Sequence, residues 1–453
     1  MTSVDLVVKN GTIVTGRSSF TGALAVRDGK IVFVGSNESL PNADRVVDAA
    51  GLYVLPGVID VHVHLRDPGY TYKEDFGSGT AAAAAGGVTC VFDMPNNSPP
   101  TKNVEALNAK VEAAEAKAVV DYCLYGLLTV DSLPEVEPLS RAGVIGYKLF
   151  MGETTGKIVP PSDGELSDQF SEVSKLGLRV AVHAEDDPAI QSRVRTLRTQ
   201  GRTDAHAHFE SRPSVVEEEA VQKAISYATE AKCDLHISHL SSRWGTVAVQ
   251  RARTDRASVS AETCPHYLIL DDRRYSEIGP LMKINPSIKT AEDQASLWDA
   301  IRTGTIEMIA SDHSPHVLEE KTKPVIFDCA SGFPGLETSV PLILTQVNRG
   351  TITLNKYVQL TSENPAKIWK LSPKKGSLSV GSDADFTIVD MKARAKIDSS
   401  RFYSKAKWSP FDGFEVEGMP VYTIVRGNIV MDHGAVTEEH AGMMVQPAKP
   451  TAN

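Results

Sequence analysis

Two histidines and an arginine alternate along one apolar segment near residue 60. His62, His64 and Arg66 lie within the sequence Val-Ile-Asp-Val-His-Val-His-Leu-Arg at residues 58–66. The β-branched residues predict a buried strand over residues 58–65, on which side chains two positions apart share a face. Two imidazoles on one face can bind a divalent metal ion, and the nearby guanidinium can bind a carboxylate. Because a His-x-His motif also occurs on ordinary strands, the rest of the chain has to support this interpretation.

The middle of the chain, residues 56–372, alternates between strand-like and helical segments. An alanine run at residues 79–87 ends in Gly86-Gly87 and predicts a helix that is followed at once by a strand. Eight such β and α units favour an α/β fold, a TIM-like (β/α)8 barrel, which would be the catalytic part of the chain. The predicted strands are 58–65, 88–93, 120–126, 146–150, 178–183, 234–239, 258–263 and 307–311, and the clearest helices are 104–117, 164–175, 215–231 and 291–302.

Both ends of the chain contain short strands and turns. Asn10-Gly11, Asp28-Gly29 and Gly427-Asn428 are strong hairpin signals, and no segment before residue 55 is long enough for a helix. We therefore predict one small, discontinuous β-sandwich domain that is built from residues 1–55 and 373–453. The barrel would lie between these two parts, over residues 56–372.

Polar residues gather where the predicted barrel strands end. In a parallel barrel the loops that follow the strands carry the reactive groups, so residues at these ends face one common site. Chance is a poor explanation for so many histidines, a lysine and an acid at one rim. The residues at these positions are His62, His64, Arg66, Asn96, Lys148, His183, His239, Asp312, His313 and His316.

These residue types indicate a metal centre. Neutral imidazoles and a carboxylate bind borderline divalent ions, with zinc the first choice. Four histidines exceed the needs of one open zinc site, so two ions are expected, and such a pair requires an anionic bridge. Lys148 on its strand could supply that bridge as a carbamate after adding CO2. It could equally be a cation that binds the substrate, and the residue types leave both roles open.

At this point the chain resembles the cyclic amidohydrolases of the amidohydrolase superfamily, and most closely the dihydroorotases. The resemblance extends over almost the whole length, including the β-rich ends. It rests on the segments 56–69 (PGVIDVHVHLRDPG), 93–96 (DMPN), 147–150 (YKLF), 183–185 (HAE), 236–239 (HISH), 311–316 (SDHSPH), 332–338 (GFPGLET) and 407–413 (KWSPFDG).

The resemblance implies a role for each metal-binding residue. One zinc ion would be held by His62, His64 and Asp312, the second by His183 and His239, and N6-carboxylated Lys148 would bridge them. Asp312 would also be the catalytic general base and general acid. His236 lies an odd number of residues before His239, so it faces the other way on a strand and is expected to be structural.

The substrate is expected from the residues around the metal centre. In dihydroorotases the ring carboxylate is bound by the residues that correspond to Arg66, Asn96 and His316, and all three match. Asn285 falls where dihydroorotases contact the substrate. The resemblance therefore implies interconversion of N-carbamoyl-L-aspartate and L-dihydroorotate, a step of pyrimidine biosynthesis.

Other features resemble the allantoinases and hydantoinases. Ser314 stands where most dihydroorotases have alanine, and residues 264–268 (CPHYL) resemble allantoinases and hydantoinases. Residues 96–100 (NNSPP) resemble the corresponding loop of allantoinases. Glu153 occupies the position at which hydantoinases (dihydropyrimidinases) usually have a tyrosine. Allantoinase, which converts allantoin to allantoate, is the first alternative and hydantoinase the second. A non-catalytic scaffold homologue would have no need for the six metal-binding residues, and none of them is missing.

Composition limits the partners. The chain has 453 residues and a net charge of −10, with 42% hydrophobic and 23% charged residues, so there is no basic surface for nucleic acid or membranes. Five scattered cysteines predict reduced, buried thiols. The N-terminus has no secretory pattern and no apolar run is long enough to span a membrane, so a cytoplasmic protein is expected. We also expect a homo-oligomer, either a dimer or a tetramer.

Overall fold

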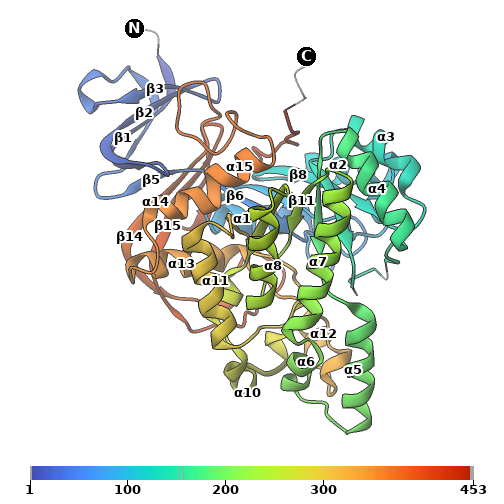
Figure 1. Ribbon diagram of the computed structural model, residues 1–453. Coiled ribbons are helices and arrows are strands. Elements are labelled where there is room, and N and C mark those ends of the chain that lie inside the picture. The colour runs from blue at the N-terminus through green and yellow to red at the C-terminus, as the bar shows by residue number, and fades with distance from the viewer. Residues whose placement is uncertain (1–2, 153, 157, 449–453) are drawn as a thin grey trace.

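A parallel barrel forms the centre of the molecule. The structure is a computed structural model that describes residues 3–152, 154–156 and 158–448. Each barrel strand pairs with the next in chain order, and Figure 1 shows the helices packed around them. The strands are β6 (Val58–Val63), β7 (Val88–Asp93), β8 (Asp121–Leu128), β9 (Gly146–Phe150), β10 (Arg179–His183), β11 (Asp234–Ile237), β12 (Val259–Thr263) and β13 (Met308–Ile309).

The barrel is nearly closed. The first and last strands meet through a parallel bridge between Val63 and His313, and the backbone N–H of His64 donates to the carbonyl oxygen of His313 at 2.7 Å. All six residues of β6 are buried, as the predicted strand requires, because both faces of a barrel strand are covered. The TIM-like barrel predicted from the alternating segments is confirmed.

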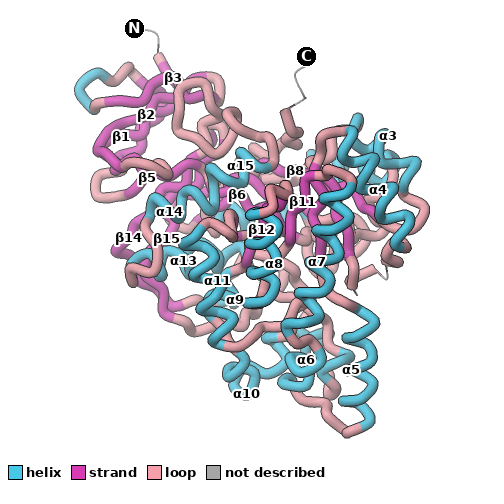
Figure 2. The backbone as a smooth tube through the Cα atoms, in the orientation of Figure 1, coloured by secondary structure: helices cyan, strands magenta, loops and turns pink. Residues whose placement is uncertain are grey.

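Helices cover the outer face of the barrel (Figure 2). The predicted helices begin and end within a few residues of their expected positions. Local signals explain these ends: Ser162 caps α4 (Asp163–Lys175), and Gly304, with a φ of 85°, ends α11 (Ala291–Thr303). Other helices on the barrel are α1 (Phe76–Ala85), α2 (Val104–Glu115), α3 (Val136–Arg141), α7 (Ser214–Glu230), α8 (Arg243–Thr254), α13 (Leu336–Asn348), α14 (Leu354–Val358) and α15 (Asn364–Ile368).

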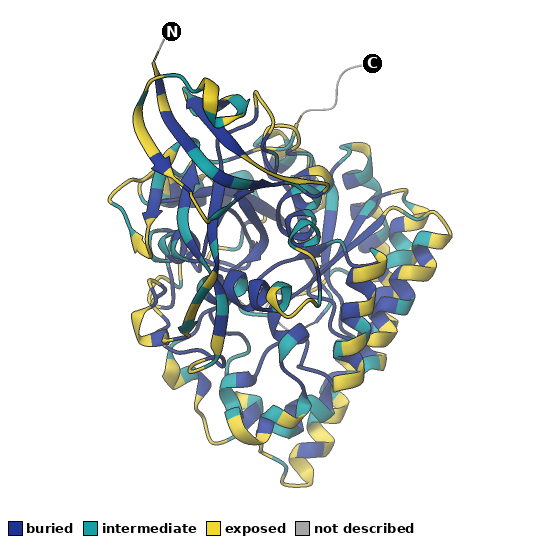
Figure 3. Cartoon of the chain, turned by 90° about the vertical axis from the view of Figure 1, so that its left-hand side faces the viewer, coloured by how far each residue is buried: buried dark blue, intermediate teal, exposed yellow. Residues whose placement is uncertain are grey.

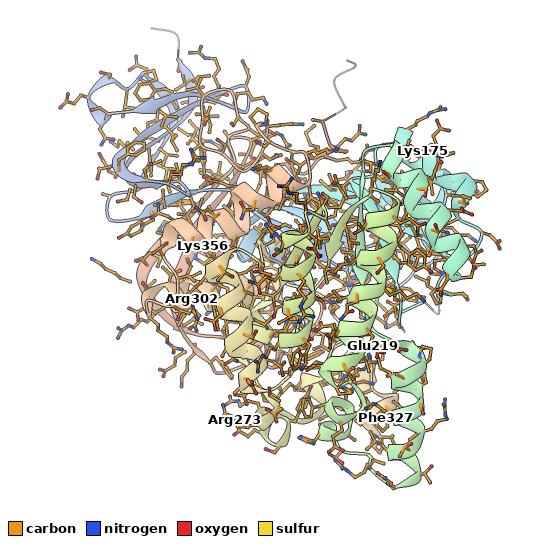
Figure 4. The ribbon with its side chains drawn as sticks, viewed as in Figure 1. Lys175, Glu219, Arg273, Arg302, Phe327 and Lys356 are labelled. Atoms are coloured by element: carbon orange, nitrogen blue, oxygen red, sulfur yellow. The ribbon has the colours of Figure 1, made fainter. Side chains whose placement is uncertain are left out.

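Several helices extend beyond one end of the barrel. They lie in the lower part of Figure 1, away from both chain termini. Since α5 follows β10 and α12 follows β13, this extension stands at the carboxyl ends of the strands. Figure 4 labels Phe327, whose ring lies 5.2 Å from the guanidinium carbon of Arg198 on α5. The helices of this extension are α5 (Asp187–Thr199), α6 (Ala205–Ser211), α10 (Tyr275–Ile278) and α12 (Leu318–Lys321), while α9 (Pro265–Ile269) lies beside α11 (Figure 2).

Single helical turns occur in many of the connections. They are η1 (Asn37–Ser39), η2 (Leu133–Glu135), η3 (Asp272–Arg274), η4 (Gly279–Met282), η5 (Ile326–Asp328), η6, which is a π-helix (Gln359–Glu363), and η7 (Ser399–Arg401).

The barrel strands are buried, whereas the outer faces of the helices are exposed (Figure 3). An aromatic group fills the barrel interior: the ring of Trp369 meets the edges of Phe92 and Tyr125 at centroid distances of 5.7 Å and 5.3 Å. Trp369 directly follows α15, so the chain after the last barrel strand closes one end of the barrel. The predicted buried thiols are confirmed, since all five cysteines are buried and free.

A second sheet is built from both chain ends. Its strands run in the order β17-β16-β15-β14-β5-β1-β2-β3, with β4 paired to β1. The predicted mixing of the two ends is therefore confirmed, while boundaries near residues 55 and 373 remain a proposal. The strands are β1 (Val4–Val14), β2 (Ser19–Arg27), β3 (Lys30–Gly35), β4 (Ala43–Asp48), β5 (Tyr53–Pro56), β14 (Phe386–Lys396), β15 (Glu415–Val425), β16 (Asn428–Asp432) and β17 (Ala435–Val436).

One of the three predicted hairpins is wrong. Asp28-Gly29 and Gly427-Asn428 lie at turns between antiparallel strands, but Asn10-Gly11 lies inside the continuous strand β1. Asn10 adopts a φ of 63° and its backbone N–H donates to Oδ1 of Asn37 at 2.8 Å, while the pairing register shifts between Val8 and Gly11. The same backbone preference of asparagine thus produces a β-bulge instead of a chain reversal.

A buried ionic cluster joins the barrel to the C-terminal sheet. Nζ of Lys375 lies 2.7 Å from Asp385 and 3.0 Å from Asp383, and it also pairs with Asp121 on β8. Arg426 forms a further ion pair with Asp121. A third cation, Lys30, pairs with Asp383 at 2.5 Å, so the charges of the three carboxylates are compensated and the cluster is an ionic contact between the two parts of the chain.

Candidate active site

The predicted site residues meet at one cavity. Although they are spread over the chain from residue 62 to residue 316, nearly all of them lie at or just beyond the carboxyl ends of barrel strands. A cavity of about 600 Å³ opens there, beneath the extension formed by α5 and α6. Its walls include His62, His64, Arg66, Asn96, His183, His239, Asn285, Asp312 and His316.

One group of possible metal ligands contains His62, His64 and Asp312. The Nε2 atoms of the two histidines lie 3.4 Å and 3.3 Å from Oδ1 of Asp312. All three residues are buried, and one ligand atom from each lies within 4.8 Å of the others. This spacing leaves room for one cation between the three atoms, and the side chains are of the types that bind zinc.

A second group contains His183 and His239. Nδ1 of His183 faces Nε2 of His239 at 2.9 Å, and Nδ1 of His239 has no hydrogen-bond partner although it is buried. The other nitrogen of His183, Nε2, lies 3.0 Å from a carboxylate oxygen of Glu185, which also binds Arg212 at 2.5 Å. Because Glu185 occupies Nε2, the atom of His183 left for a metal is Nδ1.

Burial keeps His62, His64 and His239 neutral. Desolvation, followed by the ammonium group of Lys148, lowers the pKa of His62 to about 4. Burial likewise holds the pKa values of His64 and His239 well below the ordinary value. A neutral imidazole offers a lone pair to a metal ion, whereas an imidazolium does not. The donor atoms and their protonation therefore fit a cationic metal centre.

Lys148 lies close to both groups. It is buried on β9, its Nζ donates to Oγ of Ser238 at 2.7 Å, and its charge acts on His62, His239 and Asp312. Burial lowers the pKa of Lys148 to about 8, so a larger fraction of neutral amine is present than on an exposed lysine. A neutral amine is the form that reacts with CO2.

The backbone is unusual at several of these residues. Arg66, His239 and Asp312 have φ values of 61°, 37° and 47°. Residues other than glycine adopt this left-handed region only when the surrounding structure holds them there, and such positions cluster at functional sites. In each case the turn directs a side chain from the strand end into the cavity.

One wall of the cavity is arranged to receive an anion. The guanidinium of Arg66 is buried; its NH2 lies 3.2 Å from Nε2 of His316, its Nε donates to the carbonyl oxygen of Pro315, and its NH1 has no partner. Burial lowers the pKa of Arg66 to about 10, which leaves the group charged at neutral pH. A buried charged donor without a partner is costly, so this wall suits a negatively charged ligand.

His316 connects this wall to a second cation. Its Nδ1 lies 3.1 Å from Nζ of Lys73 and 3.0 Å from a carboxylate oxygen of Glu320. Lys73 also forms an ion pair with Glu320 at 2.7 Å and faces the cavity. The orientation of the His316 ring therefore depends on a lysine from the loop after β6 as well as on its own loop.

Asn96 and Asn285 differ in their availability. Oδ1 of Asn96 lies 2.8 Å from Nδ1 of His64, and its Nδ2 donates to Thr154, so this amide holds a metal-binding ring in place. Asn285 lines the cavity and its Oδ1 is buried without a partner. Asn285 is thus the freer of the two predicted substrate contacts.

Two further residues singled out in the sequence lie elsewhere. His313 is buried with its ring between Glu74 and Gly335. Its Nδ1 accepts a hydrogen bond from the backbone N–H of Gly335. His236 faces Ser260 and Glu262. Glu153, which occupies the position of a tyrosine in most hydantoinases, lies outside the residues that the structure describes.

Sequence reasoning missed the carboxylates that hold the histidines. Glu185 follows His183 by two positions, and the spacing His-Ala-Glu could have indicated a shared direction. Glu262 is a single acid in the apolar strand β12, which is itself an unusual pattern. Lys73 gave no local signal, because its role depends on a contact with His316 more than 240 residues away.

A barrel with clustered, neutral histidines and a carboxylate at its carboxyl end defines a metal-dependent hydrolase, and comparisons with known proteins agree. The model of the amidohydrolase family matches residues 53–430. A solved structure of L-hydantoinase (dihydropyrimidinase) from Arthrobacter aurescens superposes with a TM-score of 0.95 at 36% identity, over 98% of this chain and 100% of that one.

Proteins with similar sequences are named for different substrates. An allantoinase from Solibacter usitatus is 35% identical over 99% of this chain and 98% of its own length. A dihydroorotase from Methanothermobacter thermautotrophicus is 37% identical over 92% of both chains. The protein belongs to the amidohydrolase family. Within that family of metal-dependent enzymes it is a hydrolase of cyclic amides.

Among the residues that the structure describes, no helix has both the length and the apolar character needed to cross a membrane.

Proposed function

We propose that this cyclic amidohydrolase interconverts N-carbamoyl-L-aspartate and L-dihydroorotate. The observation that carries the proposal is the unpartnered NH1 of Arg66, which is buried beside His316 in the cavity wall. Dihydroorotate carries a ring carboxylate, and burying such a group needs charge-assisted hydrogen bonds. Arg66 supplies the charge, while His316 and Asn285 line the same cavity.

We further propose that the two histidine groups hold two divalent ions, with zinc the first choice. His62, His64 and Asp312 would bind one ion, and His183 and His239 the other. Lys148, carboxylated on Nζ, would bridge them; its burial near both groups and its lowered pKa support this role. When bound, the ions would lower the pKa of a water molecule and polarise the amide carbonyl.

The residues of the chain then share the remaining tasks. Asp312 takes a proton from the attacking water and returns it to the ring nitrogen as the carbon–nitrogen bond breaks. Arg66 and His316 fix the carboxylate, so the carbonyl carbon faces the water at the metal centre. In the reverse direction Asp312 accepts the proton of the ureido nitrogen as the ring closes on the carboxyl carbon, and it passes this proton to the departing hydroxyl, which leaves as water.

A second candidate is hydrolysis of an uncharged cyclic ureide, either allantoin or a hydantoin. The similarity to an L-hydantoinase structure and to an allantoinase favours it. These rings have no carboxylate, so they would leave the charge of Arg66 unmatched. The two candidates therefore differ in the use of one buried guanidinium.

A substrate panel with the metal-loaded enzyme tests the choice. We expect the highest kcat/KM for dihydroorotate, measured against allantoin and hydantoin under the same conditions. Metal analysis of the same sample should give two ions per chain, and mass spectrometry or electron density should reveal the carbamate on Lys148. A preference for either uncharged ring would contradict the dihydroorotase proposal without affecting the metal centre.

A further inference from the structure

Glu262 lies where the two groups of metal-binding histidines meet. It belongs to β12, which supplies none of the proposed metal ligands, and its side chain is fully buried. Its Oε1 lies 2.5 Å from Nδ1 of His62 and accepts the backbone N–H of His239 at 3.2 Å. Its Oε2 lies 3.0 Å from Nε2 of His236. One carboxylate thus contacts His62 on β6 and two histidines on β11 and the loop that follows it.

The backbone contact favours one direction for these hydrogen bonds. The N–H of His239 can only donate, so Oε1 of Glu262 is an acceptor there. A proton on Nδ1 of His62 completes the second bond to the same oxygen. The lone pair of His62 then lies on Nε2, and this is the atom that faces Asp312 at 3.4 Å.

The other proposed ligands have different supports. Glu185 contacts Nε2 of His183 and so leaves Nδ1 for a metal, and the amide of Asn96 contacts Nδ1 of His64. These partners each hold a single ring. Glu262 differs because it holds the ring of His62, from one group, and the backbone of His239, from the other.

We propose that Glu262 is a positioning residue, which fixes His62 with its proton on Nδ1 and sets the spacing between the two metal groups through His239. The inference rests on the metal centre of the proposed function, but it does not depend on the substrate. Carboxylates that orient a metal-binding imidazole in this way also raise its basicity, and their loss typically weakens metal binding by about 10–100-fold.

The test replaces Glu262 by glutamine in the full chain. Glutamine has nearly the same volume, but only one of its two terminal atoms accepts a hydrogen bond. It therefore carries no negative charge to raise the basicity of His62, even where its amide faces Nε2 of His236 and its oxygen still faces Nδ1 of His62. We expect Glu262→Gln to bind zinc about 10–100-fold more weakly than wild type in competition with a chelator. The melting temperature of the metal-free protein should change little.

Ser260→Ala is the matched control. It removes the contact of His236 with Oγ of Ser260 on the same strand and leaves both oxygens of Glu262 in place. Zinc affinity should stay within about threefold of wild type, which is a smaller change than the one expected for Glu262→Gln. If both variants lose affinity equally, or if Glu262→Gln lowers only the melting temperature, Glu262 has no positioning role.

A measurement on wild-type protein keeps the inference testable if Glu262→Gln does not fold. Neutron diffraction from zinc-loaded crystals locates the protons directly, and we expect one on Nδ1 of His62 and none on Glu262. A proton on Glu262, or His62 protonated on Nε2, would overturn the inference. A wild-type chain that binds no zinc would overturn the proposed metal centre as well, whereas equal zinc affinity of the variant overturns only the role of Glu262.

Discussion

Arg66 is the residue on which the choice of substrate depends. Its NH1 is buried without a partner, and its NH2 contacts His316. Removing one member of a desolvated charge pair costs about 2–5 kcal/mol, since the other charge is left unpaired. Arg66→Met should therefore lower kcat/KM for dihydroorotate by about 100-fold or more.

Allantoin and hydantoin are the internal controls for Arg66→Met. Neither carries a ring carboxylate, so any residual turnover of these rings should change much less. If all three rings lose activity to the same extent, Arg66 supports the loop beside the metal centre and does not select the substrate.

Asp312 is expected to move the proton. It is buried, its oxygen faces two proposed metal ligands, and burial raises its pKa above the ordinary value. Asp312→Asn removes the basic oxygen and should lower kcat by about 10²–10⁴-fold, with a greater loss if metal also leaves. Metal content and kcat are measured on the same sample. A variant that retains both ions and more than about half of its activity would falsify the proton transfer, since such a loss is far below the usual contribution of an acid–base group.

At the scale of elements, α13 meets the C-terminal part of the chain through a carboxyl group. Glu337 in its first turn accepts the backbone N–H groups of Tyr403 and Ser404 at 2.8 Å and 3.2 Å. Burial nevertheless raises the pKa of Glu337 from 4.5 to about 7. The carboxyl group of Glu337 thus binds its proton more tightly in the folded state than in the unfolded chain. The contribution of this proton to the free energy of unfolding therefore decreases as the pH rises from about 4.5 through about 7.

Glu337→Gln should remove this dependence on pH. A shift of one pKa unit corresponds to about 1.4 kcal/mol, and partial exposure reduces the effect. Relative to wild type, the free energy of unfolding of the variant should increase by roughly 2 kcal/mol between pH 5 and pH 8. Urea unfolding of both proteins at the two pH values gives this difference. If the free energies of unfolding of the two proteins differ by the same amount at pH 5 and pH 8, Glu337 is ionised throughout this range.

At the scale of the whole molecule, the Lys375 cluster holds the barrel against the second sheet. Nζ of Lys375 contacts Asp121, Asp383 and Asp385, and all four side chains are buried. Lys375→Met leaves three buried carboxylates with too little positive charge, which should destabilise folding by about 3–5 kcal/mol.

Lys374→Met is the matched control for this prediction, because Lys374 is the exposed neighbour on the same segment. Denaturant unfolding should show a loss for Lys375→Met alone, while the metal content of the folded fraction stays unchanged. A similar stability of the two variants would show that the cluster contributes little.

Metal binding should stabilise the whole chain. Its proposed ligands come from β6, β9 and β10 and from the loops after β6, β11 and β13, so bound ions would join distant parts of the barrel. At a free concentration of about 100 times Kd, each ion adds about 2.7 kcal/mol. Removal with a chelator should abolish activity and lower the melting temperature, and zinc with bicarbonate should restore both.

Lys148→Ala provides the comparison for metal removal. It lacks the proposed bridge, so zinc with bicarbonate should restore neither its full metal content nor its activity. Full recovery of this variant would exclude a carboxylated lysine from the centre.

Several features could be predicted from the sequence, because each depends on local spacing. The alternation of apolar and helical segments predicts the barrel, and most expected strands and helices differ from the observed ones by only a few residues. His62, His64 and Arg66 occur at intervals of two on one strand, which places them on a common face. The ends of parallel strands share one edge, so the histidines and Asp312 could be assigned to one site without coordinates.

Other features were decided by the tertiary structure, because they depend on contacts between distant residues. Glu262 meets His62 across 200 positions of sequence, and Lys73 meets His316 across 243. No periodic pattern records such pairs, since each exists only after the strands have closed into a barrel. The hydrogen bonds of Asn96 to His64 and Thr154 also join distant parts of the chain, and the role of Asn96 in substrate binding stays a prediction. Residue types and local spacing therefore predicted the chemistry of the centre, and the closed barrel determined which ring nitrogens and charges remain available for it.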